Sequence, residues 1–255
     1  MSNMKNLSKY LTYTVAPLSI IIVWYILTEF KIVSAIFLPT PSETLDAFIK
    51  AVFNKDLWSD IGFTLYRVFF GFFVAVIIGV PIGLVMGYSR RVYNALEFVV
   101  EFFRAIPATA LFPLFMLIFG IGDDAKIAIT AWGAGLVIIL NSMYGVHMSK
   151  ELRLKAAKVM NVKGLNLFTK VIFPEALPQI FTGFRVALSL SLVIVVVTEM
   201  FIGTNHGLGH RIIDAQLVYR TDDIYMTILL TGIIGFALNK ILMGVENNIV
   251  HWKGK

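Results

Sequence analysis

The chain has 255 residues, of which 58% are hydrophobic and only 15% are charged. Because soluble domains carry about a quarter charged residues, the composition excludes an ordinary water-soluble protein. Cysteine is absent, which excludes a disulfide framework, a thiolate metal site and a cysteine nucleophile. The net charge of +6 gathers in particular loops, so it favours a membrane topology and argues against binding to nucleic acid.

Apolar runs of about twenty residues predict an all-α, polytopic membrane protein with about six transmembrane helices. The first run follows two lysines but ends without a small-residue cleavage site, so we expect a retained helix and not a signal peptide. Pro107 and Pro113 predict that the third span is kinked or partly unwound. The expected spans are approximately 13–27, 61–88, 96–120, 125–146, 180–201 and 224–245.

The distribution of lysine and arginine predicts the orientation of these spans. With six crossings, all the strongly basic segments fall on one side of the membrane, which the positive-inside rule assigns to the cytoplasm together with both termini. The basic residues on this side are Lys5, Lys9, Arg90, Arg91, Lys150, Arg153, Lys155, Lys158, Lys163, Lys170, Lys253 and Lys255.

Two segments on the opposite side have structural signals of their own. Ser42 is the expected N-cap of a short helix that ends at about Phe53. Residues 203–211 are rich in glycine and histidine and are expected to form an irregular loop. Its two histidines stand four residues apart, a spacing that holds a metal on a helix, but the glycines between them disfavour a helix. We therefore predict no metal site.

The longest predicted cytoplasmic connection, residues 147–178, begins with strong helix formers at 150–160. Ala156 and Ala157 are small enough to let the backbone of another protein approach closely. Asn161 and then Gly164 tolerate a left-handed conformation.

A second short helix is expected at 165–173, closed by Pro174. The two helices predict a helix–turn–helix that lies flat at the membrane surface. A basic loop that touches only lipid headgroups is the alternative interpretation.

This connection resembles the EAA loop of ABC importer permeases through Lys155-Ala156-Ala157, Asn161 and Ile172-Phe173-Pro174. In that family the loop forms a coupling helix that docks into a cleft on the ATPase subunit. Lys155 stands where the family has Glu, Asn161 where it has Gly, and Phe173 where it has Leu. The residues to which the resemblance assigns ATPase coupling are Lys155, Ala156, Ala157, Val159, Met160, Asn161 and Gly164.

Further motifs extend the resemblance from about Leu38 to the C-terminus and are similar to the nitrate/sulfonate/taurine branch of importer permeases. Their order along the chain matches that branch, although each motif is weak by itself. They are Leu38-Pro39-Thr40-Pro41, Thr64-Leu65-Tyr66-Arg67-Val68, Gly79-Val80-Pro81-Ile82-Gly83, Arg104-Ala105-Ile106-Pro107, Gly183-Phe184-Arg185, Glu199-Met200 and Gly207-Leu208-Gly209.

The resemblance implies the fold of a type I ABC importer permease in the inner membrane. It also implies three partners: a dimer of ATPase subunits, an extracytoplasmic substrate-binding protein and a second copy of this chain. The chain has no G-x-x-x-x-G-K-[ST] phosphate loop, so ATP and Mg are expected on the partner ATPase and no cofactor on this chain. We expect one transmembrane domain over 1–255, with an N-terminal helix and extracytoplasmic segment at 1–60 and a permease core at 61–255.

Polar residues inside the spans are the candidates for the translocation path, because an ionisable group within a membrane is costly and marks function by default. The polar candidates are Arg104, Asn141, Arg185 and Glu199, and Pro107, which breaks the third span, is the fifth candidate. Either arginine is suited to attract an anion, and the resemblance favours a small anion such as an alkylsulfonate, taurine or nitrate. A structural interpretation stays open, in which the arginines extend to the headgroups and Glu199 is a buried partner or gate. Arg67, early in the second span, is expected to extend outward in the same way.

A function without an ATPase, as half of a secondary transporter or as a channel, is the alternative. An inverted-repeat transporter has broken helices in corresponding places of its two halves. Here the third span has its two prolines and the sixth has no equivalent. A channel more naturally has a repeated polar ring or filter loop. The sequence therefore favours the ATP-coupled permease.

Overall fold

The computed structural model describes residues 2–148 and 151–252, and its described elements are all helical. The predictions placed on Lys150, Lys253 and Lys255 lie outside these residues. The helices are α1 (Ser2–Glu29), α2 (Pro41–Val52), α3 (Lys55–Tyr88), α4 (Arg90–Ala105), η1 (Ala108–Leu111), α5 (Phe112–Phe119), α6 (Asp123–His147), α7 (Glu151–Val159), α8 (Gly164–Leu167), η2 (Phe168–Ile172), α9 (Phe173–Phe201), α10 (Leu208–Leu217) and α11 (Thr221–Ile249).

Among the described residues, four helices are long and apolar enough to cross a membrane: Lys55–Tyr88, Asp123–His147, Gly164–Phe201 and Thr221–Ile249. The pair formed by α4 and the following η1–α5 segment passes the same test, with a bend of 88° at the break. This bend confirms the predicted break in the third span. It follows Ala105, where Pro107 cannot donate the hydrogen bond that would continue the helix. Within α1, the stretch Val15–Glu29 is apolar but shorter than the helices that pass this test.

The predicted N-cap of α2 was wrong by two residues. Thr40 and not Ser42 caps the helix: its hydroxyl accepts from the Glu43 N–H at 3.2 Å, and its own N–H donates to the Glu43 carboxylate at 2.8 Å. Pro41 then occupies the first helical position, where a missing N–H costs nothing. The hydrogen bond from the Thr40 backbone holds the pKa of the Glu43 carboxyl below its ordinary value.

Pro174 does not close a helix, contrary to the prediction. The helical path runs on from Gly164 to Phe201. A π-helical turn, η2, directly precedes α9, and Pro174 lies in the first turn of α9. The wider turn explains the continuity, because it accommodates a residue that cannot donate the regular backbone hydrogen bond.

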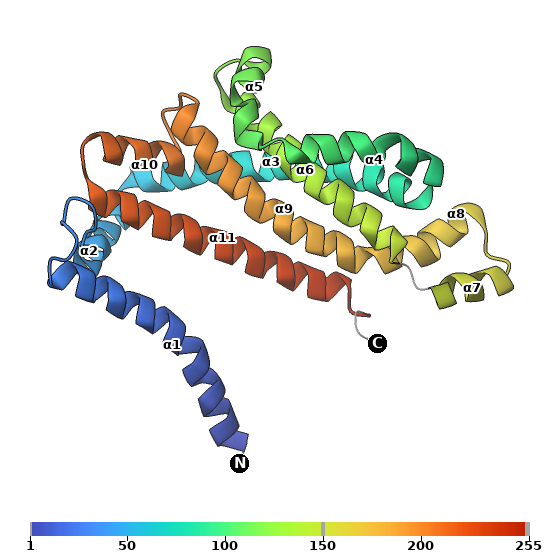
Figure 1. Cartoon of the computed structure of the whole chain (residues 1–255), viewed down its shortest axis with the longest axis horizontal. Coiled ribbons are helices and arrows are strands. Elements are labelled where there is room, and N and C mark those ends of the chain that lie inside the picture. Colours follow the sequence, from blue (N-terminus) through green and yellow to red (C-terminus); the bar gives the residue numbers. More distant parts are fainter. Residues whose placement is uncertain (1, 149–150, 253–255) are drawn as a thin grey trace. The chain divides into compact units, whose positions relative to one another are not determined.

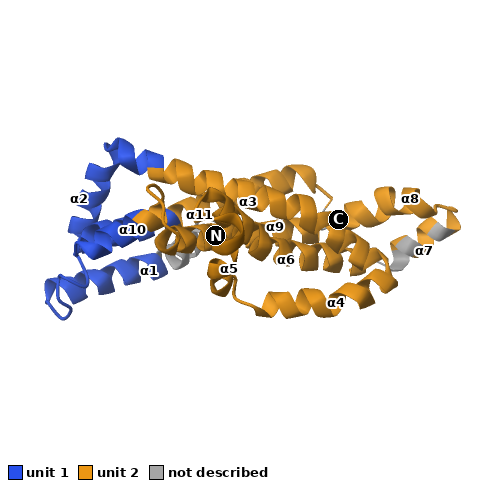
Figure 2. Ribbon diagram, turned by 90° about the horizontal axis from the view of Figure 1, so that it is seen from above, with its two compact units in different colours: residues 1–59, 211–231 blue, residues 60–210, 232–255 orange. Residues whose placement is uncertain are grey.

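The structure divides into two compact units, Met1–Ser59 with Arg211–Thr231, and Asp60–His210 with Gly232–Lys255 (Figure 2). In the first unit, Trp24 ties α1 to the segment before α2, since its indole N–H donates to the Pro39 carbonyl at 2.8 Å. Tyr225 stacks on Trp24 with ring centroids 6.2 Å apart and donates its hydroxyl proton to the Phe37 carbonyl. These contacts hold the chain before α2 between two helices.

The second unit is built on α6, which lies against α9 over most of its length (Figure 1). Glycines let the neighbouring helices approach α6 closely. On α3, a Cβ at Gly83 or Gly87 would collide with α6 and one at Gly79 would crowd it, so this glycine spacing serves helix packing. On another face of α6, a Cβ at Gly145 would lie 2.9 Å from the Ala176 carbonyl oxygen of α9.

Candidate functional site

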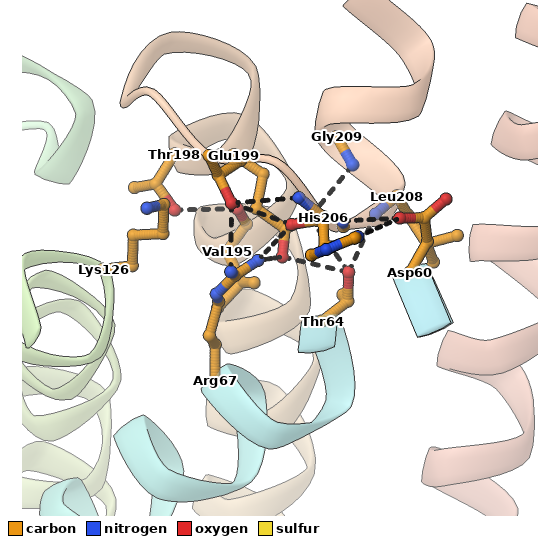
Figure 3. Close-up of polar contacts among 12 residues, drawn as sticks. Asp60, Thr64, Arg67, Lys126, Val195, Thr198, Glu199, His206, Leu208 and Gly209 are labelled. Atoms are coloured by element: carbon orange, nitrogen blue, oxygen red, sulfur yellow. Dashed lines mark hydrogen bonds and ion pairs between the residues drawn. The ribbon is translucent and has the colours of Figure 1, made fainter. Parts of the chain in front are cut away.

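Charged side chains gather where the N-terminal part of α3, the start of α6 and the end of α9 meet, and Arg67 of α3 is at their centre (Figure 3). Arg67 is 2% exposed. Its Nη1 lies 2.6 Å from Oε1 of Glu199 and its Nε lies 2.8 Å from Oδ1 of Asp123. Nη1 and Nη2 also donate to the His206 carbonyl and the Thr204 hydroxyl. One guanidinium therefore joins three helices to the loop before α10.

Glu199 of α9 is also 2% exposed, and protein donors surround its carboxylate. Besides Arg67, the Thr64 hydroxyl donates to it at 2.9–3.0 Å and the Gly209 N–H donates at 3.0 Å. The Thr64 hydroxyl in turn accepts from the Leu208 N–H at 2.9 Å. A buried charge is tolerated only when it is paired and hydrogen-bonded, and here both conditions are met.

Two glycines allow the loop to approach this carboxylate. Gly207 has φ +136°, and a Cβ there would overlap the Glu199 side chain. A Cβ at Gly209 would overlap the Val196 carbonyl of α9. The Gly207 N–H also donates to the Asp60 carboxylate at 2.9 Å. The loop therefore needs glycine at both positions, and its backbone groups are partners of the network.

These contacts correct two predictions. Arg67 does not extend outward to the headgroups, because Glu199 and Asp123 hold it inside. The segment 203–211 is irregular only to Gly207, after which α10 begins at Leu208. Its first residues are fixed by hydrogen bonds to Thr64 and Glu199, a tertiary effect that the glycine content hides. Glu199 itself agrees with the structural interpretation, as a buried partner of an arginine.

The structure does not bring the five candidate path residues together. Asn141 of α6 accepts from the Gln179 side chain of α9 at 3.0 Å, and Gly183 packs on it. Arg185 of α9 lies 3.5 Å from Glu246 of α11, which is 5% exposed. These residues, like Glu199, tie helices to each other.

Arg104 has a different environment. It lies in the last turn of α4, its side chain is 55% exposed, and its Nη2 lies 2.5 Å from Oε2 of Glu101 one turn earlier. Pro107 follows at the break between α4 and η1 and is exposed. Among the five candidates, Arg104 and Pro107 are thus the two that stand on an open surface of the chain.

The segment that resembles the EAA loop forms α7, a turn and α8–η2 (Figure 1). Asn161 has φ +55° and Gly164 has φ +59°, which confirms the predicted left-handed positions. Val159 and Met160 are 87% and 77% exposed at the end of α7. Large apolar side chains this exposed favour a surface that another protein covers.

Ala157 has the opposite environment, 5% exposed and turned toward its own chain. It lies beside a cavity of about 500 Å³ between α7, η2 and the start of α9. Its small side chain therefore serves packing within the chain, whereas Ala156, Val159 and Met160 are exposed. At the edge of this cavity, Arg153 of α7 lies 3.3 Å from Glu175 of α9 and helps to hold α7 in place.

Comparison with known proteins decides the family. The model of the family described as "Binding-protein-dependent transport system inner membrane component" matches residues 79–253. The chain belongs to this family. It is thus the permease component of an ABC importer, a multi-pass protein of the inner membrane, and the ATPase site belongs to another subunit.

Relatives match over nearly the whole length. The taurine transport system permease protein of Escherichia coli strain K12 is 28% identical over 98% of this chain and 92% of its own. A protein of the same strain whose name proposes aliphatic sulfonate transport is 31% identical over 92% and 89%. The nitrate import permease protein of Synechocystis sp. is 27% identical over 95% and 90%.

A solved structure shows the same fold. The inward-facing MetNI methionine ABC transporter aligns with a TM-score of 0.68 and 20% identity, over 76% of this chain and 95% of its own. The fold that the sequence predicted, a helical permease of the ABC importer type, is confirmed at this level.

The pairing of Arg67 with Glu199 could not be predicted locally, because 132 residues separate them. Thr64, Asp123 and Asp60 were also not predicted as partners of the network. The available signal was that charged residues lie at those ends of three apolar runs that the predicted topology places on one side of the membrane. Opposite charges at the same membrane depth need each other, and this requirement could have linked them.

Proposed function

We propose that this chain is the translocation subunit of an ATP-driven importer for a small solute with an anionic group, and that it couples to its ATPase through α7 and the turn at Asn161. The observation that carries the coupling is the pair of exposed apolar side chains, Val159 and Met160, at the end of a basic surface helix. Family membership supports it, since permeases of binding-protein-dependent systems work with an ATPase and a binding protein.

The proposed topology has six crossings with both termini in the cytoplasm. The four long helices and the bent pair provide five crossings, and α1 provides the sixth. The charge distribution supports this count, because it places α7, the loop before α4 and both chain ends on the positive side. Residues 1–60 then form the N-terminal helix and outer segment, and 61–255 form the permease core.

The proposed assembly pairs two copies of the chain with two ATPase subunits. ATP-driven closure of the ATPases would draw the two α7 helices together and switch the side to which the path opens, as a rigid-body movement. Arg153–Glu175 supports this transmission, because it links α7 directly to the long helix α9. A surface helix that is fixed to a membrane span moves with it.

The names of the relatives support the solute class. Taurine, aliphatic sulfonates and nitrate, which these names give, are all small and carry an anionic group. Of the candidate path residues, Arg104 is the exposed cation, and we propose that it and Pro107 border the path. Asn141, Arg185 and Glu199 set the spacing of the helices around it.

The coupling is tested by purifying the tagged full-length chain from its native membranes in mild detergent and identifying the ATPase that accompanies it. Val159→Arg is the test variant and Met148→Arg, also on an exposed apolar residue at the cytoplasmic end of α6, is the control. Ala157→Arg is unsuitable, because it would disrupt packing inside the chain.

We expect the ATPase with the parent chain and with Met148→Arg, and its loss with Val159→Arg. An unpaired charge buried in an interface costs about 3 kcal/mol, which is about a hundredfold in affinity. If no ATPase accompanies the parent chain, or Val159→Arg retains it, the coupling assignment fails. The ATP-independent transporter then becomes the leading account.

A further inference from the structure

One face of α4 carries a row of polar side chains. The spacing of four and three residues places them on one side of the helix. In chain order they are Arg90, Asn94, Glu97, Glu101 and Arg104. Glu101 and Arg104 pair with each other and remain 44% and 55% exposed, and Glu97 accepts a hydrogen bond from the Tyr93 hydroxyl. We call this row the polar face of α4.

The side of α4 next to the polar face is held by its own chain. Val100 is 7% exposed and packs with Met86 of α3 and with Ile139 and Met143 of α6. Phe103 meets Trp132 of α6 edge-on, with ring centroids 4.9 Å apart. This packing fixes the rotation of α4, so the polar face lies along the edge of the packed side and stays exposed.

In the proposed topology, the polar face also lies at membrane depth. With a rise of 1.5 Å per residue, Glu97 and Glu101 lie about 10 and 16 Å along the helix from Arg90 at its basic end. The hydrocarbon core is about 30 Å thick, so both carboxylates fall within it when α4 and α5 form a span. Each charge facing lipid there would cost about 2.5–3.5 kcal/mol on insertion scales. The polar face therefore needs water or a polar occupant.

We propose that the polar face of α4 lines the solute path and that Glu101 and Arg104 select a zwitterion, a small solute with both an ammonium and an anionic group. Arg90 lies at the basic end of α4, so the deeper part of the face has two carboxylates and one guanidinium and is net negative. Such a face repels a simple anion and attracts a cationic group. Arg104 binds the anionic end of the solute and Glu101, one turn away, binds the ammonium.

This inference rests on the proposed importer function and narrows its solute class. Among the solutes that the relatives' names give, an aminosulfonate such as taurine fits the polar face, whereas nitrate and simple alkylsulfonates leave the carboxylates without a partner. The solute would exchange the internal Glu101–Arg104 pair for two pairs of its own. That exchange is reversible because both side chains are half exposed.

The absence of cysteine in the chain permits a direct test. Glu97→Cys and Phe98→Cys are made singly in the tagged full-length chain and treated, in inside-out membrane vesicles, with a membrane-impermeant thiol reagent. Phe98 is the control, since it is 77% exposed but lies beside the polar face on an apolar side. The reaction is repeated with taurine and with 1-propanesulfonate, in which a methyl group replaces the ammonium.

We expect Glu97→Cys to react and Phe98→Cys to stay unmodified. Taurine should slow the reaction at position 97 about fivefold more than 1-propanesulfonate does, as a screened charge pair predicts. Adding Glu101→Gln to Glu97→Cys should abolish that difference. Equal reaction at both positions, or no reaction at position 97, overturns the path assignment. Equal protection by the two solutes, or protection that survives Glu101→Gln, overturns the selectivity.

Copurification of the ATPase is measured separately on each cysteine variant. A chain that retains its ATPase but shows no selective protection contradicts only the zwitterion assignment. A parent chain without an ATPase contradicts the proposed function itself.

Discussion

The charged residues within the membrane helices occupy two contrasting environments. Where the N-terminal part of α3 meets the end of α9, Arg67 and Glu199 are each 2% exposed. Hydrogen bonds and ion pairs fix them to each other, to Thr64 and Asp123, and to the loop before α10. On α4, Glu101 and Arg104 are about half exposed, and their ion pair joins neighbouring turns of one helix. Burying the first pair is costly unless its partners are fixed, so that pair belongs to the fold. The second pair is accessible, and we propose that it exchanges partners with a solute.

The largest effect is expected when one member of the buried pair is removed. Arg67→Ala leaves Glu199 buried without its cation, and we expect a loss of about 3–5 kcal/mol in stability. The measurement is the unfolding temperature of the purified full-length chain in a fixed detergent. An unchanged unfolding temperature would mean that the network contributes nothing to the fold.

A smaller loss is expected where the loop meets α9. Gly209→Ala places a methyl group against the Val196 carbonyl, and overpacking of this kind costs about 1–3 kcal/mol. Gly244→Ala is the matched control, because a Cβ there meets nothing within 4 Å. The same detergent unfolding assay should show a lower midpoint for Gly209→Ala alone. Equal midpoints would contradict the close approach of the loop.

Arg185→Gln tests an ion pair of intermediate burial. Arg185 is 30% exposed in its side chain while Glu246 is 6% exposed, and the two lie 3.5 Å apart. We expect a loss of about 1–2 kcal/mol, because the buried carboxylate loses a charged partner but retains other interactions. In the same unfolding assay, the midpoint of Arg185→Gln should fall less than that of Arg67→Ala. A loss as large as that of Arg67→Ala would remove the distinction between the two.

The smallest effect on stability is expected for Arg104→Ala. Exposed ion pairs contribute about 0–1 kcal/mol, so the unfolding midpoint should stay close to that of the parent chain. Solute uptake by vesicles that contain the complete transporter should fall nonetheless. A large drop in the midpoint with unchanged uptake would assign Arg104 to the fold and not to the path.

The sequence predicted local features better than distant partners. The break at Pro107 and the left-handed turn at Asn161 depend on backbone chemistry within a few residues, and both were confirmed. The cap of α2 failed because Thr40 and Ser42 are both good capping residues, and only the position of Pro41 decides between them.

Pro174 failed for a different reason. Proline ends a helix only when the missing N–H cannot be accommodated, and here a π-helical turn precedes it. The partners of Glu199 lay beyond local reasoning, since Thr64 and Arg67 are 135 and 132 residues away. The polar face of α4 was visible in the spacing of its residues, but its exposure depends on which side of α4 packs on α3 and α6.

The central claim is that a glutamate paired with an arginine stabilises the fold at Glu199 but lines the solute path at Glu101. One paired measurement tests it. Glu199→Ala and Glu101→Ala are compared for unfolding temperature in detergent and for taurine uptake by vesicles that contain the complete transporter. We predict that Glu199→Ala lowers the unfolding temperature strongly, while Glu101→Ala leaves it unchanged and lowers uptake. Equal unfolding temperatures for the two variants, or full uptake by a stable Glu101→Ala chain, would contradict the account.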